Sequence, residues 1–330
     1  MGIVRPVKEP SADPAPREDA RAPRWARRLS AAMGTSTLLA VATGTTFGFA
    51  GNLWWLFDLF AHFRLYLLAA AVLVTLGAVL LRSRRAAALG ALAVIANGAA
   101  MQPLFVAGPP PEGEHRLTVL LVNVERENGH FDAIARLIDA QHPDLVALVE
   151  PDQRWLSALD AALSGLPYRV QAPRGDNFGL ALYSRYPLRS IERDAPGGFP
   201  ALRAVIDTPA GRLPLMLVHP PPPLGAELSA ARDATFVEIA RWAATQPEAV
   251  VLGDFNATLY SAPFQAMLGS ADLRVAAAGQ GIVGTWPAPL GALGILIDHV
   301  LLRGGWRVVD FAVGPLVGSD HRPVSVALGR

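Results

Sequence analysis

A carboxylate and a carboxamide stand two residues apart, directly after a short apolar run in the second half of the chain. The run is Val250–Leu252, and Gly253, Asp254, Phe255 and Asn256 follow it. An apolar, β-branched run of this kind predicts a buried strand that ends at a turn. Side chains at i and i+2 share a direction, so a carboxylate that can take a proton from water would lie beside an amide that can donate to a phosphoryl oxygen. An ordinary Asx turn would account for the same residues.

Polar side chains of the same kind recur where other apolar runs in this half end. They are Asn123, Glu150, His219, Asp298, Asp320 and His321. These residue types together suit phosphoester hydrolysis on a hard divalent cation. Mg²⁺ takes oxygen ligands, one or two protein carboxylates among them, and keeps room for water and substrate phosphate. One carboxylate can hold the ion and a second can activate water, while His and Asn offset the charge of the phosphoryl oxygens.

The sequence pattern of the second half is typical of a fold with both strands and helices, because short apolar runs are separated by residues that favour turns. The patterns predict helices at His130–Ala140 and Glu227–Ala243. They predict strands at Leu117–Val124, Asp144–Glu150, Gly179–Tyr183, Ala201–Ile206, Pro214–His219, Ile295–Leu302, Arg307–Val313 and Pro323–Leu328, besides the one that leads to Asp254.

Six ordered segments of this half resemble the motifs of the endonuclease/exonuclease/phosphatase (DNase I-like) superfamily. They are Leu120–Asn123, Asp144–Glu150, Gly179–Pro187, Gly253–Asn256, Asp298 with its neighbours 297–301, and Gly318–Pro323. The resemblance covers residues from about 115 to 330. It implies an α/β (α+β) fold, a four-layer αββα sandwich of two mixed sheets with the active site at one edge. It also implies cleavage of phosphoesters that depends on Mg²⁺ or Mn²⁺.

The resemblance also implies which residues bind the metal. Glu150 would be the principal ligand. Asn123 would lie beside it and contact metal or phosphate. Asp320 would sit near the metal.

The remaining motif residues would carry the catalytic chemistry. Asp254 would take a proton from the attacking water, and Asn256 would orient that water or bind the phosphoryl group. His321 would contact the phosphate, with Asp298 fixing its ring, because a carboxylate selects the tautomer and favours the imidazolium. His219 would protonate the leaving oxygen or contact phosphate.

Two positions qualify the resemblance. His299 stands where family members often carry an aromatic residue after the motif aspartate, and Trp286 resembles the aromatic residue that precedes this motif. We expect Trp286 to pack rather than to stack on a base. The charges of Glu125 and Glu127 are expected to be solvated in a loop.

The first third of the chain has a different composition. Residues 1–109 hold 11 Lys and Arg against 5 Asp and Glu, whereas residues 110–330 hold 18 against 23. We expect a disordered basic tail at 1–30, three membrane-spanning helices within 31–107, a Pro- and Gly-rich linker at 108–114, and the enzymatic domain at 115–330. The three apolar runs are Thr35–Phe57, Leu65–Leu81 and Ala86–Val106. Buried helices of a soluble domain or a signal peptide are the alternatives.

The distribution of Arg predicts the orientation of these helices. The tail and the loop with Arg82, Arg84 and Arg85 are basic, so positive-inside logic places both in the cytoplasm. Three crossings would then carry the enzymatic domain to the outside of a bacterial cytoplasmic membrane. Trp54 and Trp55 fit an aromatic belt near the outer end of the first span.

The spans and the motifs together resemble a membrane-anchored bacterial branch of the superfamily. This branch includes the glycopeptide-resistance (VanJ-like) proteins and implies a lipid-linked phosphate as substrate and the bilayer as partner. Residues 110–330 contain no Lys, and their Arg are outnumbered by acids, so no broad footprint for nucleic acid is evident. A surface nuclease for DNA or RNA and a catalytically idle anchored scaffold are the alternative functions.

Overall fold

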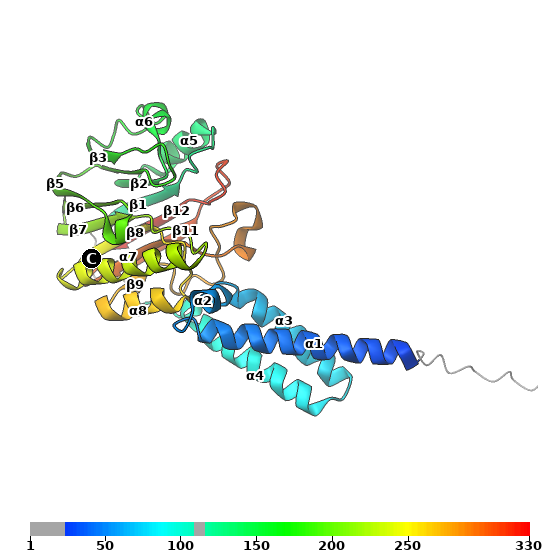
Figure 1. Ribbon diagram of the computed structural model, residues 1–330. Coiled ribbons are helices and arrows are strands. Elements are labelled where there is room, and N and C mark those ends of the chain that lie inside the picture. Colours follow the sequence, from blue (N-terminus) through cyan, green and yellow to red (C-terminus); the bar gives the residue numbers. More distant parts are fainter. Residues whose placement is uncertain (1–23, 109–115) are drawn as a thin grey trace, which may run out of the picture.

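The computed structural model describes the backbone of residues 24–108 and 116–330, and side chains from residue 33 onward. Two six-stranded sheets lie face to face, and a group of helices projects from one side of them (Figure 1). The predicted tail falls largely on residues outside the described ranges, and so does most of the predicted linker. Helix α1 (Arg24–Phe49) begins inside the segment 1–30, so the prediction of disorder is wrong from Arg24 onward.

Each sheet mixes parallel and antiparallel strands. The first sheet has the order β11 (Arg307–Val313), β12 (Val324–Gly329), β1 (Arg116–Asn123), β2 (Leu145–Val149), β4 (Leu180–Ser184) and β3 (Tyr168–Ala172). The second has the order β5 (Leu188–Asp194), β6 (Ala201–Thr208), β7 (Gly211–Val218), β8 (Ala249–Asp254), β10 (Asp298–Arg303) and β9 (Arg274–Val275). The edge strands β3 and β5 and the short strand β9 were not predicted.

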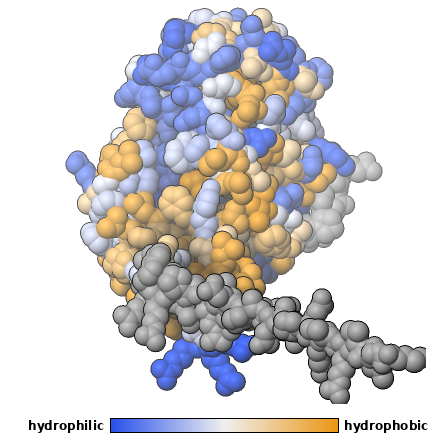
Figure 2. Space-filling view, turned by 90° about the vertical axis from the view of Figure 1, so that its right-hand side faces the viewer, coloured by the Kyte–Doolittle hydropathy of each residue, from blue (hydrophilic) through white to orange (hydrophobic). Residues whose placement is uncertain are grey.

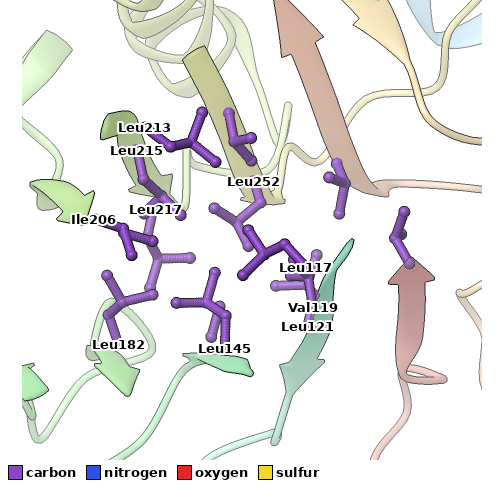
Figure 3. Packing of buried hydrophobic residues seen from close by; sticks show 14 of the residues in the cluster. Leu117, Val119, Leu121, Leu145, Leu182, Ile206, Leu213, Leu215, Leu217 and Leu252 are labelled. Atoms are coloured by element: carbon purple, nitrogen blue, oxygen red, sulfur yellow. The ribbon is translucent and has the colours of Figure 1, made fainter. Parts of the chain in front are cut away.

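The main core fills the space between the sheets. Alternate residues of each strand point inward, as the period of two in a strand requires. Figure 3 shows leucine, isoleucine and valine side chains of both sheets meeting there, among them Leu117, Val119, Leu121, Leu145, Leu182, Ile206, Leu213, Leu215, Leu217 and Leu252. Each is almost fully buried, and burial of one such side chain contributes about 1.5–3 kcal/mol.

Helices cover the outer face of each sheet and complete the predicted four layers. α5 (Phe131–Gln141) and α6 (Gln153–Ala158) pack on the first sheet. α7 (Ala226–Ala244) and α8 (Ala262–Ala271) pack on the second (Figure 1). The predicted fold class is confirmed.

The helical region differs from the three predicted spans. The apolar run Thr35–Phe57 is divided, because α1 ends at Phe49 and a separate helix α2 (Trp55–Ala61) begins after a turn. Gly51 allows the turn, since a Cβ there would lie 2.8 Å from an Asp58 carboxylate oxygen. The residues between the first two predicted runs, 58–64, are therefore mostly helical rather than a loop between spans. α3 (Arg64–Leu80) and α4 (Arg84–Met101) correspond to the second and third runs.

By length and composition, one helical segment of the described residues, Arg84–Phe105, suffices to cross a membrane. α2 and α3 together would make a second, bent by 68° at the break between them. Large apolar side chains on α3 and α4 are exposed. They include Leu73, Leu80, Leu92 and Ile95, which are 63–82% exposed. Figure 2, which looks toward the helices, shows a largely hydrophilic upper part and apolar residues gathered below it.

The helical region is joined to the sheets through buried polar contacts of α2. Asp58, 1% exposed, accepts hydrogen bonds from Ser261 Oγ at 2.8 Å, Ala262 N at 2.8 Å and Arg232 Nη2 at 3.0 Å. One turn later, His62 Nδ1 lies 3.0 Å from Thr258 Oγ1. Because these partners belong to the segment after β8 and to α7, α2 is fixed directly to the second sheet's outer layer.

Further contacts hold the rest of the helical region in place. Tyr66 Oη donates to the Leu293 carbonyl at 2.6 Å. The backbone N–H groups of Gly279 and Gly281 donate to the carbonyls of Pro103 and Leu104. The helices and the sandwich are thus joined at several separate points.

Candidate active site

Strand register explains why Asn123 and Glu150 lie side by side. β1 and β2 run parallel with Asn123 opposite Val149, so Glu150 emerges next to Asn123 where β2 ends. Glu150 has φ +65°, a left-handed conformation that is uncommon outside glycine and found most often at functional sites. With this backbone conformation the carboxylate lies 3.0 Å from the Asn123 side chain of the neighbouring strand.

The second sheet brings its own residues to the same edge. β7 and β8 run parallel with Val218 opposite Gly253, so His219 follows beside Asp254, and Asp298 of β10 is the register partner of Asp254. Gly253 has φ +147°, and a Cβ on it would collide with the carbonyl of Val218. The glycine of the Gly-Asp-x-Asn motif is therefore required by the close approach of two strands, and the motif is more than an ordinary turn.

The Asn123 side chain links the two sheets. Its Nδ2 donates to Glu150 Oε1 at 3.0 Å and to Asp254 Oδ2 at 3.2 Å, while its Oδ1 accepts from the backbone N–H of Glu125 at 3.0 Å. All three of these site side chains are buried or nearly so. The amide nitrogen of Asn123 thus donates to two carboxylates, one from each sheet.

His321 is held as a cation between two acids. Its Nδ1 donates to Asp298 Oδ2 at 2.9 Å, and its Nε2 lies 3.6 Å from Asp254 Oδ2. Burial alone would lower the pKa of His321, but the charges of Asp298 and Asp254 and the hydrogen bond to Asp298 raise it to about 10. The ring is therefore an imidazolium at neutral pH, as the pairing with Asp298 predicts.

Ser319 contributes a contact that the sequence did not reveal. Its Oγ donates to the Asn123 carbonyl at 2.8 Å and accepts from the His321 backbone N–H at 3.0 Å. Ser319 thereby ties the His321 loop to the end of β1. Its position two residues before His321 was the available signal, since serine side chains often bond to nearby backbone in turns.

His219 and Asn256 form the opposite wall. His219 Nε2 lies 3.6 Å from Asp254 Oδ2 and 3.9 Å from Glu150 Oε1. Asn256 Nδ2 donates to the Pro220 carbonyl at 3.0 Å and lies 3.3 Å from His219 Nε2. Burial lowers the pKa of His219, so this ring is neutral beside the acids, in contrast to His321.

Among the described residues, the site offers its buried acids few positive partners besides His321. Burial raises the pKa of Glu150 to about 7, against the opposing hydrogen bond from Asn123. Burial also raises the pKa of Asp254, although His321 opposes this shift. Such a pair of buried carboxylates is the environment that a cation would stabilise.

The donor set fits a divalent metal. Glu150, His219 and Asp254 each offer a ligand atom, and these atoms lie within 4.8 Å of one another. A second such group is Asp254, Asp298 and His321, but there Asp298 already accepts the Nδ1–H of His321. Carboxylate oxygens beside an amide are suited to Mg²⁺ or Mn²⁺, so the first group is the better place for the metal.

Asp320 lies at the rim of the site. Its side chain is 49% exposed, its Oδ2 accepts from Trp286 Nε1 at 2.9 Å, and its Oδ1 is 3.8 Å from His321 Nε2. Its backbone N–H donates to Glu125 Oε2 at 2.8 Å. Asp320 belongs to neither metal-suited group of the described residues, and Glu125, predicted to be solvated, instead braces the loop of Asp320. Trp286 orients the carboxylate of Asp320 as well as packing.

His299 packs in an aromatic cluster, as an aromatic residue at this position would. Its ring lies against Phe255 and Phe264, at centroid distances of 5.7 and 4.8 Å, and its Nε2 donates to the Ala257 carbonyl at 2.9 Å. Burial lowers its pKa to about 4, so it is neutral. This departure from the usual pattern therefore leaves the catalytic residues in place.

The model of the endonuclease/exonuclease/phosphatase family matches residues 120–321, more than half of the chain. The chain belongs to this family. Members of the family are metal-dependent phosphoester hydrolases. The acids, amides and imidazolium described above are the types of group that this reaction requires. We therefore assign the chain to this class of enzyme.

Solved structures support the fold. An endonuclease/exonuclease/phosphatase protein from Beutenbergia cavernae is 19% identical over 66% of this chain and 72% of its own, with a TM-score of 0.54. A mannosyl-6-phosphatase from Bacteroides thetaiotaomicron is 17% identical over 65% of this chain and 100% of its own, with a TM-score of 0.55. A humanized TDP2 from D. rerio is 15% identical over 65% and 99%, with a TM-score of 0.55. No curated protein sequence matches the chain significantly.

Proposed function

We propose that the chain is a membrane-anchored, divalent-metal-dependent hydrolase that removes phosphate from a lipid-linked phosphate or pyrophosphate at the outer leaflet of the bacterial cytoplasmic membrane. The observation that carries this proposal is one cavity whose lining joins the catalytic residues to α2 of the helical region. Glu150, Asp254 and His321 lie along its polar part, and Leu59 and Phe63 contribute to its apolar part.

In the proposed reaction, a water molecule attacks phosphorus in line with the leaving oxygen. Asp254 takes a proton from this water as the new P–O bond forms and the bond to the leaving oxygen breaks. The His321 imidazolium, oriented by Asp298, donates a hydrogen bond to a phosphoryl oxygen and offsets its developing charge. No covalent intermediate with the protein is required.

The other residues position the substrate. His219 is neutral and presents its Nε2 toward the carboxylates, which suits it to contact the phosphate or, with the proton on Nε2, to donate a hydrogen bond to the leaving oxygen. Asn123 and Asn256 orient the phosphoryl group and the water. Glu150 would hold the Mg²⁺ or Mn²⁺ ion, with Asp254 and His219 beside it, and the ion would supply positive charge against the phosphoryl oxygens when it is bound.

The charge of the domain favours a lipid over a nucleic acid. A nuclease that binds along a strand needs several cations to replace counterions, and residues 110–330 have more acids than Arg and no Lys. One similar structure is that of a mannosyl-6-phosphatase, whereas TDP2 from D. rerio has been solved with a single-stranded DNA product. Both classes of substrate therefore belong in the test.

The experiment uses the purified full-length protein in detergent with Mg²⁺. It is offered a long-chain isoprenoid pyrophosphate and, separately, supercoiled plasmid DNA, with Asp254→Ala as the control on each. We expect phosphate release from the lipid and intact plasmid. Nicking of DNA without lipid hydrolysis would make the protein a nuclease, and inactivity on both would favour an anchored scaffold.

The outward orientation of the sandwich has its own test, which the absence of cysteine makes simple. We compare Ser270→Cys, on exposed α8, with Ser83→Cys, in the exposed turn between α3 and α4. A membrane-impermeant maleimide added to intact cells or spheroplasts should label Ser270→Cys and leave Ser83→Cys unlabelled until the membrane is opened. The reverse labelling pattern would contradict the orientation.

A further inference from the structure

The catalytic cavity is much larger than its polar part. Its volume is about 950 Å³, near the upper end of the range for small-molecule sites, and the catalytic residues make up only part of its lining. Much of the rest of the lining is apolar, and three separate parts of the chain contribute to it beside the catalytic residues. These are α2 with the turn that follows it, the aromatic pair Phe178 and Phe199, and the proline-rich loop that leads into α7.

Two of the apolar residues that line the cavity are largely exposed. Leu224 is 77% exposed and Phe63 is 49% exposed, and both line the cavity. Leu228, on the first turn of α7, also lines the cavity and is partly buried. Exposed apolar residues that gather at a cavity indicate a surface that a ligand covers.

The aromatic pair connects this apolar surface to the reacting group. The rings of Phe178 and Phe199 have centroids 4.8 Å apart, and the Phe178 ring lies 5.2 Å from that of His219. His219 in turn is 3.6 Å from Asp254. A molecule with its phosphate at Asp254 would therefore have its next atoms against an aromatic wall.

The charge of the lining limits what that molecule can be. Among the described residues that line the cavity, Arg126 is the one Arg or Lys, and Asp176 and Asp320 add negative charge. A polymer with many phosphates would meet no row of cations here. A single phosphorylated head with an uncharged tail matches both the polar and the apolar parts.

We propose that the apolar part of this cavity is a binding subsite for the hydrocarbon chain of the substrate, running from the Phe178 and Phe199 wall to a mouth formed by Phe63 and Leu224. This inference rests on the proposed function and names the substrate as a phosphate or pyrophosphate ester of a long, uncharged chain. Because Phe63 lies in the turn between α2 and α3, the mouth opens beside the apolar helices, where a chain held in the bilayer would enter.

Two pyrophosphates with the same head and different chains test the subsite. Full-length protein in detergent is offered a C15 isoprenyl pyrophosphate and a C5 isopentenyl pyrophosphate, and kcat/KM is measured on each. The double variant Phe63→Ser with Leu224→Asn is compared with Val237→Glu, a matched exposed position on α7 outside the cavity. We expect the wild-type preference for the longer chain to fall about tenfold in the double variant and to stay unchanged in Val237→Glu.

The possible results separate the subsite from the proposed function. Equal wild-type rates on both chains, or equal losses on both in the double variant, would overturn the subsite and leave the phosphoesterase standing. Wild-type protein that hydrolyses neither compound would overturn the lipid function and the subsite with it. If the double variant instead lost cleavage of a single-stranded oligonucleotide and kept its chain preference, the apolar wall would be a platform for bases.

Discussion

Replacing Asp254 with Asn should reduce turnover by about a thousandfold while the protein keeps its fold. The amide retains the size of the side chain and can still accept from the Asn256 backbone N–H, which lies 2.8 Å from Oδ1. It cannot take a proton from water, and it weakens the negative group that faces His321. The expected result is a loss in kcat with little change in the unfolding temperature.

The matched control is Asp139→Asn, the same change on the exposed face of α5. Rates with saturating substrate and thermal unfolding curves should be recorded for both variants. Activity within a few-fold of wild type in Asp254→Asn would remove Asp254 from the role of base. A large fall in unfolding temperature would instead mean that the loss reflects damaged structure.

Replacing Asp58 with Ala should destabilise the junction between the helices and the sandwich by about 3–5 kcal/mol. Asp58 is buried and accepts three hydrogen bonds, and its removal leaves the buried Arg232 with one remaining acidic partner, Asp233, at 2.9 Å. The backbone N–H of Ala262 and the hydroxyl of Ser261 also lose their acceptor. Because these residues follow the Asp254 motif in the chain, we expect turnover to fall as well.

Thermal unfolding in detergent measures the effect, and a second substitution separates charge from packing. Arg232→Met in the Asp58→Ala background removes the buried charge that Asp233 alone would face, and it should recover part of the lost stability, because an apolar pair can replace a buried ion pair. Unchanged unfolding and turnover in Asp58→Ala would show that the α2 contacts are incidental. Failure of Arg232→Met to recover stability would assign the effect to Ser261 and Ala262 instead.

The motif residues of the site could be predicted because each lies where a buried strand ends, and strand ends are recognisable in the sequence. Glu150, Asp254 and Asn123 each follow or end an unbroken apolar run, and a buried strand that stops at a polar residue presents it at the sheet edge. The pairing of Asp298 with His321, expected from the resemblance, appears as a 2.9 Å hydrogen bond. The rim position of Asp320 was not evident, since it depends on the contact with Trp286.

The role of α2 could not be predicted from the sequence. Hydrophobicity does not distinguish an apolar side chain that faces lipid from one that faces a protein domain, so Thr35–Phe57 was read as one continuous span. Asp58 and His62 follow this run, and their residue types alone do not indicate a buried contact. Their partners, Arg232 and Thr258, are far away in sequence, and only the folded chain brings them together.

The edge strand β5 was missed for a related reason. Its sequence, from Leu188 to Asp194, is mostly charged or polar, and its side chains are largely exposed. Edge strands often carry charge, which protects them from pairing with other chains and also removes the alternating apolar signal. The central strands β1, β2 and β8, buried on both faces, gave long apolar runs and were predicted readily.

The central claim is that buried acids of this site hydrolyse a phosphoester with the help of a divalent ion. The most direct measurement is phosphate release from the isoprenoid pyrophosphate by full-length protein that has been treated with chelator, before and after Mg²⁺ or Mn²⁺ is returned. We predict negligible release without metal, recovery with it, and no recovery in Asp254→Asn. Release that persists in chelator, or that Asp254→Asn retains, would contradict the account.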